Sequence, residues 1–235
     1  MKILAFDTST MTVSVAVLEN TDIISQYHLQ GQVRHSEALI NMIEEIFSHL
    51  NFELRDLDLI AVGHGPGSFT GLRISITAAK ILSQILSIPV KSVSTLESLT
   101  KQIEMDGFIV PILDARRHRL YTSYFKKEGD TILRLEEDQA KDIDEIGKDI
   151  KDKESLIFIG DGIETAREEL EKLLPQAKFI SKGNSSIQAS SIALLAQDKY
   201  LAEGPDNLYE LEPNYLRPSQ AMREYRRKHG HDVQI

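Results

Sequence analysis

The sequence predicts an α/β protein built from two lobes of similar design. Three apolar strand patterns joined by short turns come first, and strand and helix patterns then alternate. A second strand–Asp–turn–strand unit begins about a hundred residues after the first, which indicates an internal duplication. Because strands that alternate with helices form sheets covered by helices, we expect two mixed sheets.

The first predicted elements are an antiparallel meander and a helix. Apolar residues fill Lys2–Phe6 up to Asp7, and strand patterns follow at Thr12–Glu19 and Asp22–Leu29. The short turns between them favour antiparallel pairing. An amphipathic helix is predicted over Ser36–Leu50 because apolar residues recur at helical spacing, namely Leu39, Met42, Ile43, Ile46, Phe47 and Leu50.

A buried strand, a glycine-rich turn and a second helix follow. The strand is the apolar run Leu59–Val62, and the helix runs from Leu72 to Ser87 and ends before Pro89. Glycine allows positive φ and the close approach of another backbone or ligand, and Ser68 or Thr70 can cap the helix. The spacing fits neither a P-loop nor a dinucleotide fingerprint, although the string itself is distinctive. It reads Gly63-His64-Gly65-Pro66-Gly67-Ser68-Phe69-Thr70-Gly71-Leu72-Arg73.

A strand at Pro89–Val93 and a short helix at Leu96–Glu104 complete the first half. The order β-β-β-α-β-α-β-α is that of a ribonuclease H-like lobe. We therefore place an N-terminal ribonuclease H-like lobe with partner-binding helices at residues 1–104, and a smaller, degenerate second lobe with a basic C-terminal tail at residues 105–235.

The second half restarts the pattern. The apolar run Ile109–Leu113 ends at Asp114, and the returning strand is predicted at Leu120–Phe125. Asp7 precedes Val13 by six positions, as Asp114 precedes Leu120. An acidic segment then replaces the helix-rich middle of the first lobe. The remaining predicted elements are strands at Leu156–Ile159 and Lys178–Ile180 and helices at Glu164–Leu174 and Ser190–Glu203.

Composition narrows the functional class. No run approaches the roughly 18 apolar residues needed to span a bilayer, no leader is visible, and the absence of cysteine excludes disulfides and thiolate metal sites, so we expect a cytoplasmic protein. The net charge of −9 argues against unaided nucleic-acid binding over a broad surface. The basic stretch Tyr215–Ile235 could touch RNA or an acidic partner, although short charged termini are more often solvated.

Asp7, Asp114 and Gly160 are candidates for a degenerate nucleotide site. If the two lobes pack as pseudo-symmetric halves, the two aspartate turns would face one another across a cleft, as paired turns straddle nucleotide phosphates in actin-like kinases. The first turn has no glycine, however, and the second carries bulky arginines. Aspartates that cap turns are therefore the favoured interpretation. Gly160-Asp161-Gly162 could receive a nucleoside or form a plain strand-to-helix turn, which is the safer interpretation.

Other chemistry is disfavoured. No H-E-x-x-H or similar histidine pair occurs, so we expect no metal site. The Gly-x-Ser-x-Gly nucleophile turn is also missing. Arg73 lies in a first helical turn, where the helix dipole disfavours a cation, so an anion, a partner chain, or an acid such as Asp56 or Asp58 should hold it.

The predicted helix 72–87 has an apolar arc wider than one sheet face requires. Its apolar residues split into two stripes, one formed by Ile74, Ala78, Ile81, Ile85 and Ile88 and the other by Leu72, Ile76, Ala79, Leu82 and Leu86. A second layer of the chain or another protein should cover the extra face.

With these residues assembled, the chain resembles the TsaB (YeaZ) family of bacterial proteins. The match covers the first half well and is most specific in the string from Gly65 to Arg73. The matching segments are Ile3–Thr10, His35-Ser36-Glu37, Gly65-Pro66-Gly67-Ser68-Phe69-Thr70-Gly71-Leu72-Arg73, Ser92–Glu97, Asp114-Ala115-Arg116-Arg117 and Pro213–Arg217.

The resemblance implies the ASKHA (actin-like) fold and a non-catalytic paralogue of the TsaD/Kae1 proteins, which transfer threonylcarbamoyl to an anticodon-loop adenosine of tRNA. Thr95 and Leu99 stand where TsaD has its metal-binding histidines. The implied role is a scaffold without cofactor that pairs with TsaD, with TsaE joining, forms homodimers alone and meets tRNA at most indirectly. The residues expected at the partner interface are His35, Leu39, Met42, Ile43, Ile46, Ile74, Ala78, Ile81 and Ile85.

Two rival functions stay open at this point. One is an ATP-dependent phosphotransferase or ATPase that acts alone through Asp7 and Asp114. The other is a peptidase, the old label of this superfamily, which no metal ligand, catalytic cysteine or serine turn supports.

Overall fold

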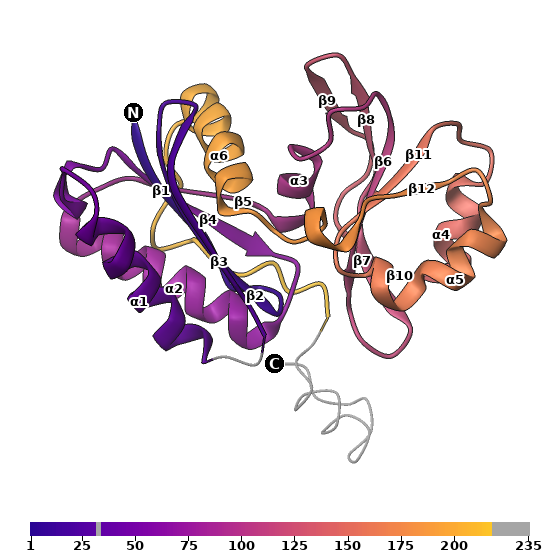
Figure 1. Ribbon diagram of the computed structural model, residues 1–235, viewed down its shortest axis with the longest axis horizontal. Helices are drawn as coiled ribbons and strands as arrows, with labels where there is room; N and C mark the ends of the chain where they lie inside the picture. The colour runs from indigo at the N-terminus through magenta and orange to yellow at the C-terminus, as the bar shows by residue number, and fades with distance from the viewer. Residues whose placement is uncertain (32–33, 218–235) are drawn as a thin grey trace.

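The computed structural model describes residues 1–31 and 34–217, which form two lobes side by side (Figure 1). The predicted basic tail lies mostly outside the described residues. The first sheet has the order β3-β2-β1-β4-β5, in which β1 pairs antiparallel with β2 and parallel with β4. Its strands are β1 (Lys2–Asp7), β2 (Thr12–Glu19), β3 (Asp22–Gln30), β4 (Leu59–Gly65) and β5 (Val90–Ser94).

The second sheet repeats the order and the strand directions of the first, as β10-β7-β6-β11-β12. This repetition supports the predicted internal duplication. The second copy is smaller, since β12 has only two residues. Its strands are β6 (Gly107–Asp114), β7 (Arg119–Thr122), β10 (Gln139–Asp142), β11 (Leu156–Ile159) and β12 (Lys178–Phe179), with β8 (Phe125–Glu128) and β9 (Thr131–Arg134) added beside β6.

Helices and sheets alternate in layers across the molecule (Figure 1). Helices α1 (His35–Ser48) and α2 (Phe69–Leu86) cover the outer face of the first sheet, whereas α3 (Thr95–Thr100) and α6 (Ala189–Glu203) lie between the sheets. Helices α4 (Ile143–Ile150) and α5 (Ile163–Leu173) cover the outer face of the second sheet. The short 3-10 helices η1 (Leu54–Asp56) and η2 (Lys182–Asn184) complete the described elements. No described helix has the length and apolar character that crossing a membrane requires.

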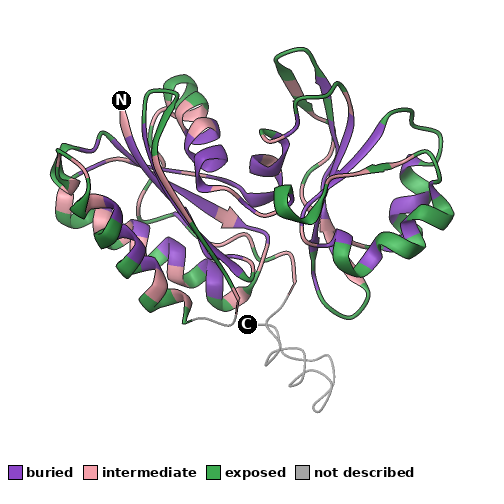
Figure 2. Ribbon diagram, viewed as in Figure 1, coloured by how far each residue is buried: buried purple, intermediate pink, exposed green. Residues whose placement is uncertain are grey.

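Strand alternation sends side chains to different cores. On β1, Leu4 and Phe6 face α1 and α2, while Ile3 and Ala5 join a central core that contains residues of both lobes. Buried residues in the structure follow this layering (Figure 2). The predicted division at residues 104/105 falls between the sheets, yet α6 packs on the strands of the first sheet. The second half of the chain therefore contributes a layer to the first lobe.

The acidic segment holds structure that the sequence prediction missed. Strands β8, β9 and β10 and helix α4 lie in it, and β7 with β8 replaces the single strand predicted at Leu120–Phe125. A signal for α4 was present. Asp142 and Glu145 form a capping box at its start, and Ile143, Ile146 and Ile150 recur at helical spacing on its buried side. The charged residues between them masked this pattern.

Candidate functional site

The glycine-rich loop between β4 and α2 closes on the chain's own first turn, between β1 and β2. A Cβ on Gly71 would lie 1.9 Å from the carbonyl oxygen of Thr8, and a Cβ on Gly67 would lie 2.6 Å from that of Ser9. The N–H of Ser68 donates to the Ser9 carbonyl at 2.6 Å, and the Thr8 hydroxyl donates to the Gly71 carbonyl at 2.6 Å. These glycines are therefore needed for packing inside the chain.

The loop then starts α2. Ser68 is the N-cap residue and its hydroxyl accepts from the N–H of Gly71 at 3.4 Å, so Ser68, and not Thr70, has the predicted capping role. Gly65 has a φ of +110° and is joined to Pro66 by a cis peptide bond. A left-handed backbone at this point requires glycine.

Asp7 is enclosed by the residues around it. Its Oδ1 accepts from the N–H and the hydroxyl of Ser9, both at 2.7 Å, and its Oδ2 accepts from the Thr95 hydroxyl at 3.4 Å. A Cβ on Gly63 would lie 2.0 Å from that Oδ2. Burial raises the pKa of Asp7 to about 6, against the hydrogen bonds from Ser9 and Thr95, which lower it. These hydrogen bonds agree with the favoured interpretation, in which Asp7 caps its own turn, and the burial of Asp7 contradicts the alternative in which it faces Asp114 across an open cleft.

Arg73 is held by aromatic rings. Its guanidinium lies 4.1 Å from the centre of the Phe69 ring, and its Nε donates to the Tyr215 hydroxyl at 2.9 Å. The rings of Phe69 and Tyr215 stack with centroids 4.6 Å apart. Neither Asp56 nor Asp58, the acids considered from the sequence, is its partner. Tyr215 lies 142 residues after Arg73 in the sequence, so local sequence patterns could not identify it as the partner.

The segment after α6 ties the two lobes together. Asp206 accepts from both the N–H and the hydroxyl of Ser92, each at 2.7 Å, and pairs with the buried Lys91 at 3.1 Å. Farther along, the N–H of Asn214 donates to the His64 carbonyl at 2.8 Å. Arg217 then donates to carbonyl oxygens of the β6–β7 turn in the second lobe.

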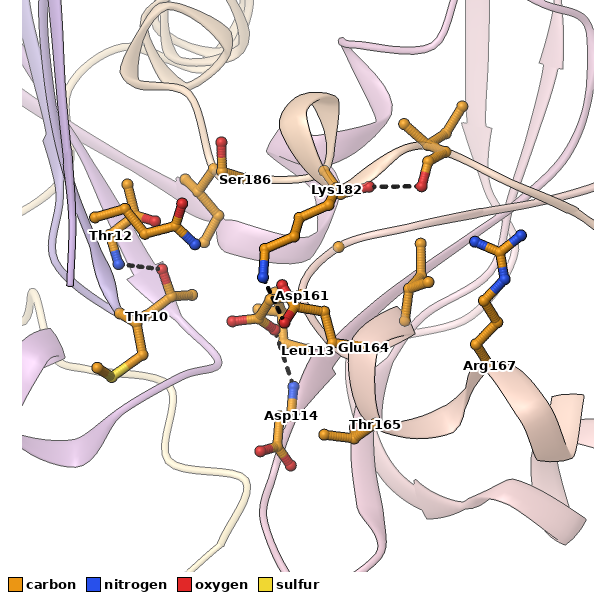
Figure 3. A pocket seen from close by; sticks show the side chains of 17 residues that line it. Thr10, Thr12, Leu113, Asp114, Asp161, Glu164, Thr165, Arg167, Lys182 and Ser186 are labelled. Carbon is orange, nitrogen blue, oxygen red and sulfur yellow. Dashed lines mark hydrogen bonds and ion pairs between the residues drawn. The ribbon is translucent and has the colours of Figure 1, made fainter.

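A pocket of about 340 Å³ lies between the lobes (Figure 3). The first lobe contributes Thr10, Met11 and Thr12 from its first turn. The second contributes Asp114 and, from the turn between β11 and α5, Gly160 and Asp161. The structure therefore brings two of the three predicted nucleotide-site residues, Asp114 and Gly160, to one pocket, and it leaves Asp7 outside the pocket wall.

The second-lobe side of this pocket carries a small excess of negative charge, with the carboxylates of Asp114, Asp161 and Glu164 against the cations of Lys182 and Arg167. Asp161 accepts from the N–H of Asp114 at 3.1 Å, and Lys182 pairs with Glu164 at 2.9 Å. Burial raises the pKa of Asp161 to about 6, and the nearby Asp114 and Glu164 add to this effect against the lowering by the Asp114 N–H. Because like charges repel, this wall disfavours an unaccompanied triphosphate.

The two positions at which the family resemblance implies the metal-binding histidines of TsaD lie in the interior of this chain. Thr95 and Leu99 are both fully buried, and Thr95 accepts from the Gly65 N–H at 3.2 Å while donating to Asp7. Within residues 1–31 and 34–217, no group of three or more His, Asp or Glu side chains is arranged to hold a metal ion.

The predicted partner interface divides into two parts. On α1, the apolar side chains point into the first lobe's outer core, at no more than 8% exposure, and the structure corrects their assignment to a partner: Leu39, Met42, Ile43 and Ile46. His35 is half-buried and donates to the Thr10 carbonyl at 2.9 Å. The α2 stripe differs, because Ile81 and Ile85 are 50% and 74% exposed.

Some residues of this region escaped the sequence prediction. Tyr215, Asp161 and Asp206 are central to the contacts above, but each acts on a residue distant in sequence. The sequence held signals for two of them, since Tyr215 lies in the matching segment Pro213–Arg217 and Asp161 in the candidate turn Gly160-Asp161-Gly162. Arg73 needed a partner, and Asp161 stood between two glycines at a strand end.

Comparison with known proteins adds an independent finding. The family model for TsaD, tRNA N6-adenosine threonylcarbamoyltransferase, matches residues 24–225. The tRNA threonylcarbamoyladenosine biosynthesis protein TsaB of Bacillus subtilis is 31% identical over 94% of this chain and 96% of its own length. TsaB of Escherichia coli is 31% identical over 60% of this chain and 62% of its own. YeaZ from Pseudomonas aeruginosa superposes with a TM-score of 0.75 at 22% identity, covering 92% of this chain and 99% of that one.

Proposed function

This chain belongs to the TsaB (YeaZ) family of tRNA threonylcarbamoyladenosine biosynthesis proteins, and from that premise we propose that it is a non-catalytic subunit that activates a TsaD partner in the cytoplasm, with TsaE joining the pair. The partner would transfer threonylcarbamoyl to the anticodon-loop adenosine of tRNA. The observation that carries the proposal is the uncovered apolar stripe of α2.

The stripe consists of Ile74, Ala78, Ile81 and Ile85, which follow one another at three- and four-residue spacing. Ile74 and Ala78 are half-buried, and the two isoleucines beyond them are more exposed. Helix α1, which lies beside α2 (Figure 1), adds Ile40 at 47% exposure. An apolar helical face of this kind suits a helix-to-helix interface.

TsaD is the favoured occupant because this chain itself matches the TsaD family model over most of its length. Two proteins of one fold present equivalent helices on the outer face of the first sheet. They can pair through them with approximate two-fold symmetry, as two copies of this chain can when TsaD is absent. We infer that the homodimer and the heterodimer use this same stripe.

The test is a double substitution, Ile81→Glu with Ile85→Glu. Burying two carboxylates in an apolar interface should weaken co-purification with the TsaD protein of the same organism by about 100-fold or more. Because both side chains are exposed, the melting temperature should stay near that of the unaltered chain. The matched control is Leu201→Glu, at a 68% exposed leucine of α6 on the opposite side of the first sheet. Full capture of the double variant, or equal loss with the control, would refute the assignment.

A second candidate, an ATP-binding phosphotransferase or ATPase, has the pocket between the lobes in its favour. The enclosure of Asp7 and the carboxylates of the second-lobe wall weigh against it. Isothermal titration of the isolated chain with ATP and magnesium separates the two functions. Tight binding followed by hydrolysis would favour this alternative, and no heat of binding would favour the scaffold.

A further inference from the structure

The turn between β6 and β7 gathers positive charge on an acidic protein. Arg116, Arg117 and His118 occupy it in succession, and all three are exposed. Within the described part of the chain, the side chains of the two arginines form neither an ion pair nor a hydrogen bond. The chain as a whole carries a net charge of −9, so two adjacent exposed arginines, with the single carboxylate of Asp114 at the start of their turn, are a local exception.

The backbone of the same turn is in an unfavourable conformation. The φ angles of Arg116, Arg117 and His118 are +60°, +57° and +56°, in the left-handed region that favours glycine. Asp114 holds the turn, since its Oδ1 accepts from the N–H of Arg116 at 2.7 Å. A turn selected only for stability would carry glycine or asparagine at such positions. Strain of this kind points to side chains that are kept for a function.

A third arginine lies against this turn, and an aromatic ring lies close to that arginine along the chain. Arg217 donates to the carbonyl oxygens of Ala115 and Arg116, which brings its charge against the underside of the turn. Tyr215, two residues earlier and thus within about 7 Å along the chain, is 39% exposed and stacks on Phe69. The surface therefore combines arginines with a partly exposed aromatic ring.

We propose that the Arg116-Arg117-His118 turn, braced by Arg217 and adjacent to Tyr215, binds the phosphate backbone of RNA. Arginines bind phosphate oxygens in pairs of hydrogen bonds, and aromatic rings stack on unpaired bases. An acidic peptide would pair with the arginines but carries no base to lie against the exposed part of the Tyr215 ring. The proposal rests on the proposed function for the identity of the RNA, which is tRNA. The family resemblance implied that this chain meets tRNA at most indirectly, and the proposal adds a direct contact between this turn and the tRNA.

Binding of an unmodified tRNA transcript tests the proposal. The full chain, alone and after capture by its TsaD partner, is titrated at several salt concentrations and compared with an Arg116→Ala/Arg117→Ala variant. We expect the variant to bind tRNA about 10-fold or more weakly than the unaltered chain near 0.1 M salt. The slope of log affinity against log salt concentration should be smaller by about one to two, because two phosphate contacts are lost. Capture by TsaD should not change, which separates failure of this proposal from failure of the proposed function.

The matched control is Lys151→Ala/Lys153→Ala, which removes two exposed cations elsewhere on the second lobe. Equal affinity of the arginine variant and the unaltered chain, an equal loss with the lysine control, or no tRNA binding in either form would overturn the proposal. So would loss of TsaD capture with unchanged tRNA binding.

A further variant, Arg117→Gly, separates binding from stability. Glycine relieves the left-handed backbone, so the melting temperature should stay equal or rise while tRNA affinity falls. Unchanged affinity with this variant would also contradict the proposal.

Discussion

The two aspartate turns occupy the same place in the two sheets and have opposite surroundings. Each follows the central strand of its sheet, β1 or β6, and each aspartate accepts from the backbone N–H two residues later. Asp7 is fully buried, whereas Asp114 is exposed at the pocket between the lobes.

The difference comes from the loop that follows the neighbouring parallel strand. After β4, the glycine-rich loop reaches the first turn itself and covers it, with Gly71 against Thr8. After β11, Gly160 and Gly162 instead pack against the carbonyl of Ile112, two residues before Asp114. The second turn is therefore left open to solvent. The same strand–turn–strand unit is thus buried inside the first lobe and exposed on the surface of the second.

The largest expected loss of stability comes from disrupting the contact between the glycine-rich loop and the first turn. Gly71→Ala places a Cβ 1.9 Å from the Thr8 carbonyl, so the loop and the turn must separate. We expect a loss of about 3 kcal/mol in the free energy of unfolding, measured by urea titration. Gly162→Ala in the second lobe, with its nearest atom at 3.0 Å, should cost less. Gly183→Ala, with no atom within 4 Å, is the neutral control, and a Gly71→Ala protein as stable as this control would contradict the comparison.

An intermediate effect should appear in the pH dependence of stability. Because burial raises the pKa of Asp7 from 3.8 to about 6, the folded state binds more protons than the unfolded state in this range. Asp7 therefore contributes stability at low pH that is lost as the pH rises through about 4 to 6.

Asp7→Asn keeps the shape of the side chain and removes this titration. On going from pH 4 to pH 7, the unaltered chain should lose about 2 kcal/mol of unfolding free energy relative to the Asp7→Asn variant. Paired urea titrations at the two pH values measure it. A constant difference would mean that Asp7 is not sealed as described.

The smallest effect is expected at the open turn. Asp114→Ala removes the acceptor for the Arg116 N–H, which solvent can replace, so stability should fall by about 1 kcal/mol or less. Loss of a neighbouring carboxylate should also lower the pKa of Asp161, which carboxyl NMR titration can follow. A loss as large as that of Gly71→Ala would mean that the two turns do not differ.

Local sequence patterns predicted much of this fold. Apolar runs located β1 and β2, the glycine string located the β4–α2 connection, and Ser68 was one of the two residues expected to cap α2. The second lobe was less predictable, because its charged residues obscured the pattern of β8 to β10 and α4.

The candidate site was only partly predictable. Asp114 and Gly160 do line one pocket, but the enclosure of Asp7 depends on Thr95, far away in sequence. Helix α1 shows the same limit. Its apolar stripe was visible in the sequence, but Leu39 and Met42 were assigned to a partner, and they pack in the core of the first lobe instead.

Periodicity and turn residues were enough to establish two related α/β lobes and their repeated aspartate turns, and the matching motif segments, above all Gly65–Arg73, carried the resemblance to the TsaB family. Contacts between distant segments decided the rest: the sealing of Asp7, the return of α6 to the first sheet and the pairing of Tyr215 with Arg73. The physical reason is that a pattern along the chain specifies which faces are apolar. Which surface covers each face depends on how the layers close on one another, and only the packed molecule defines that.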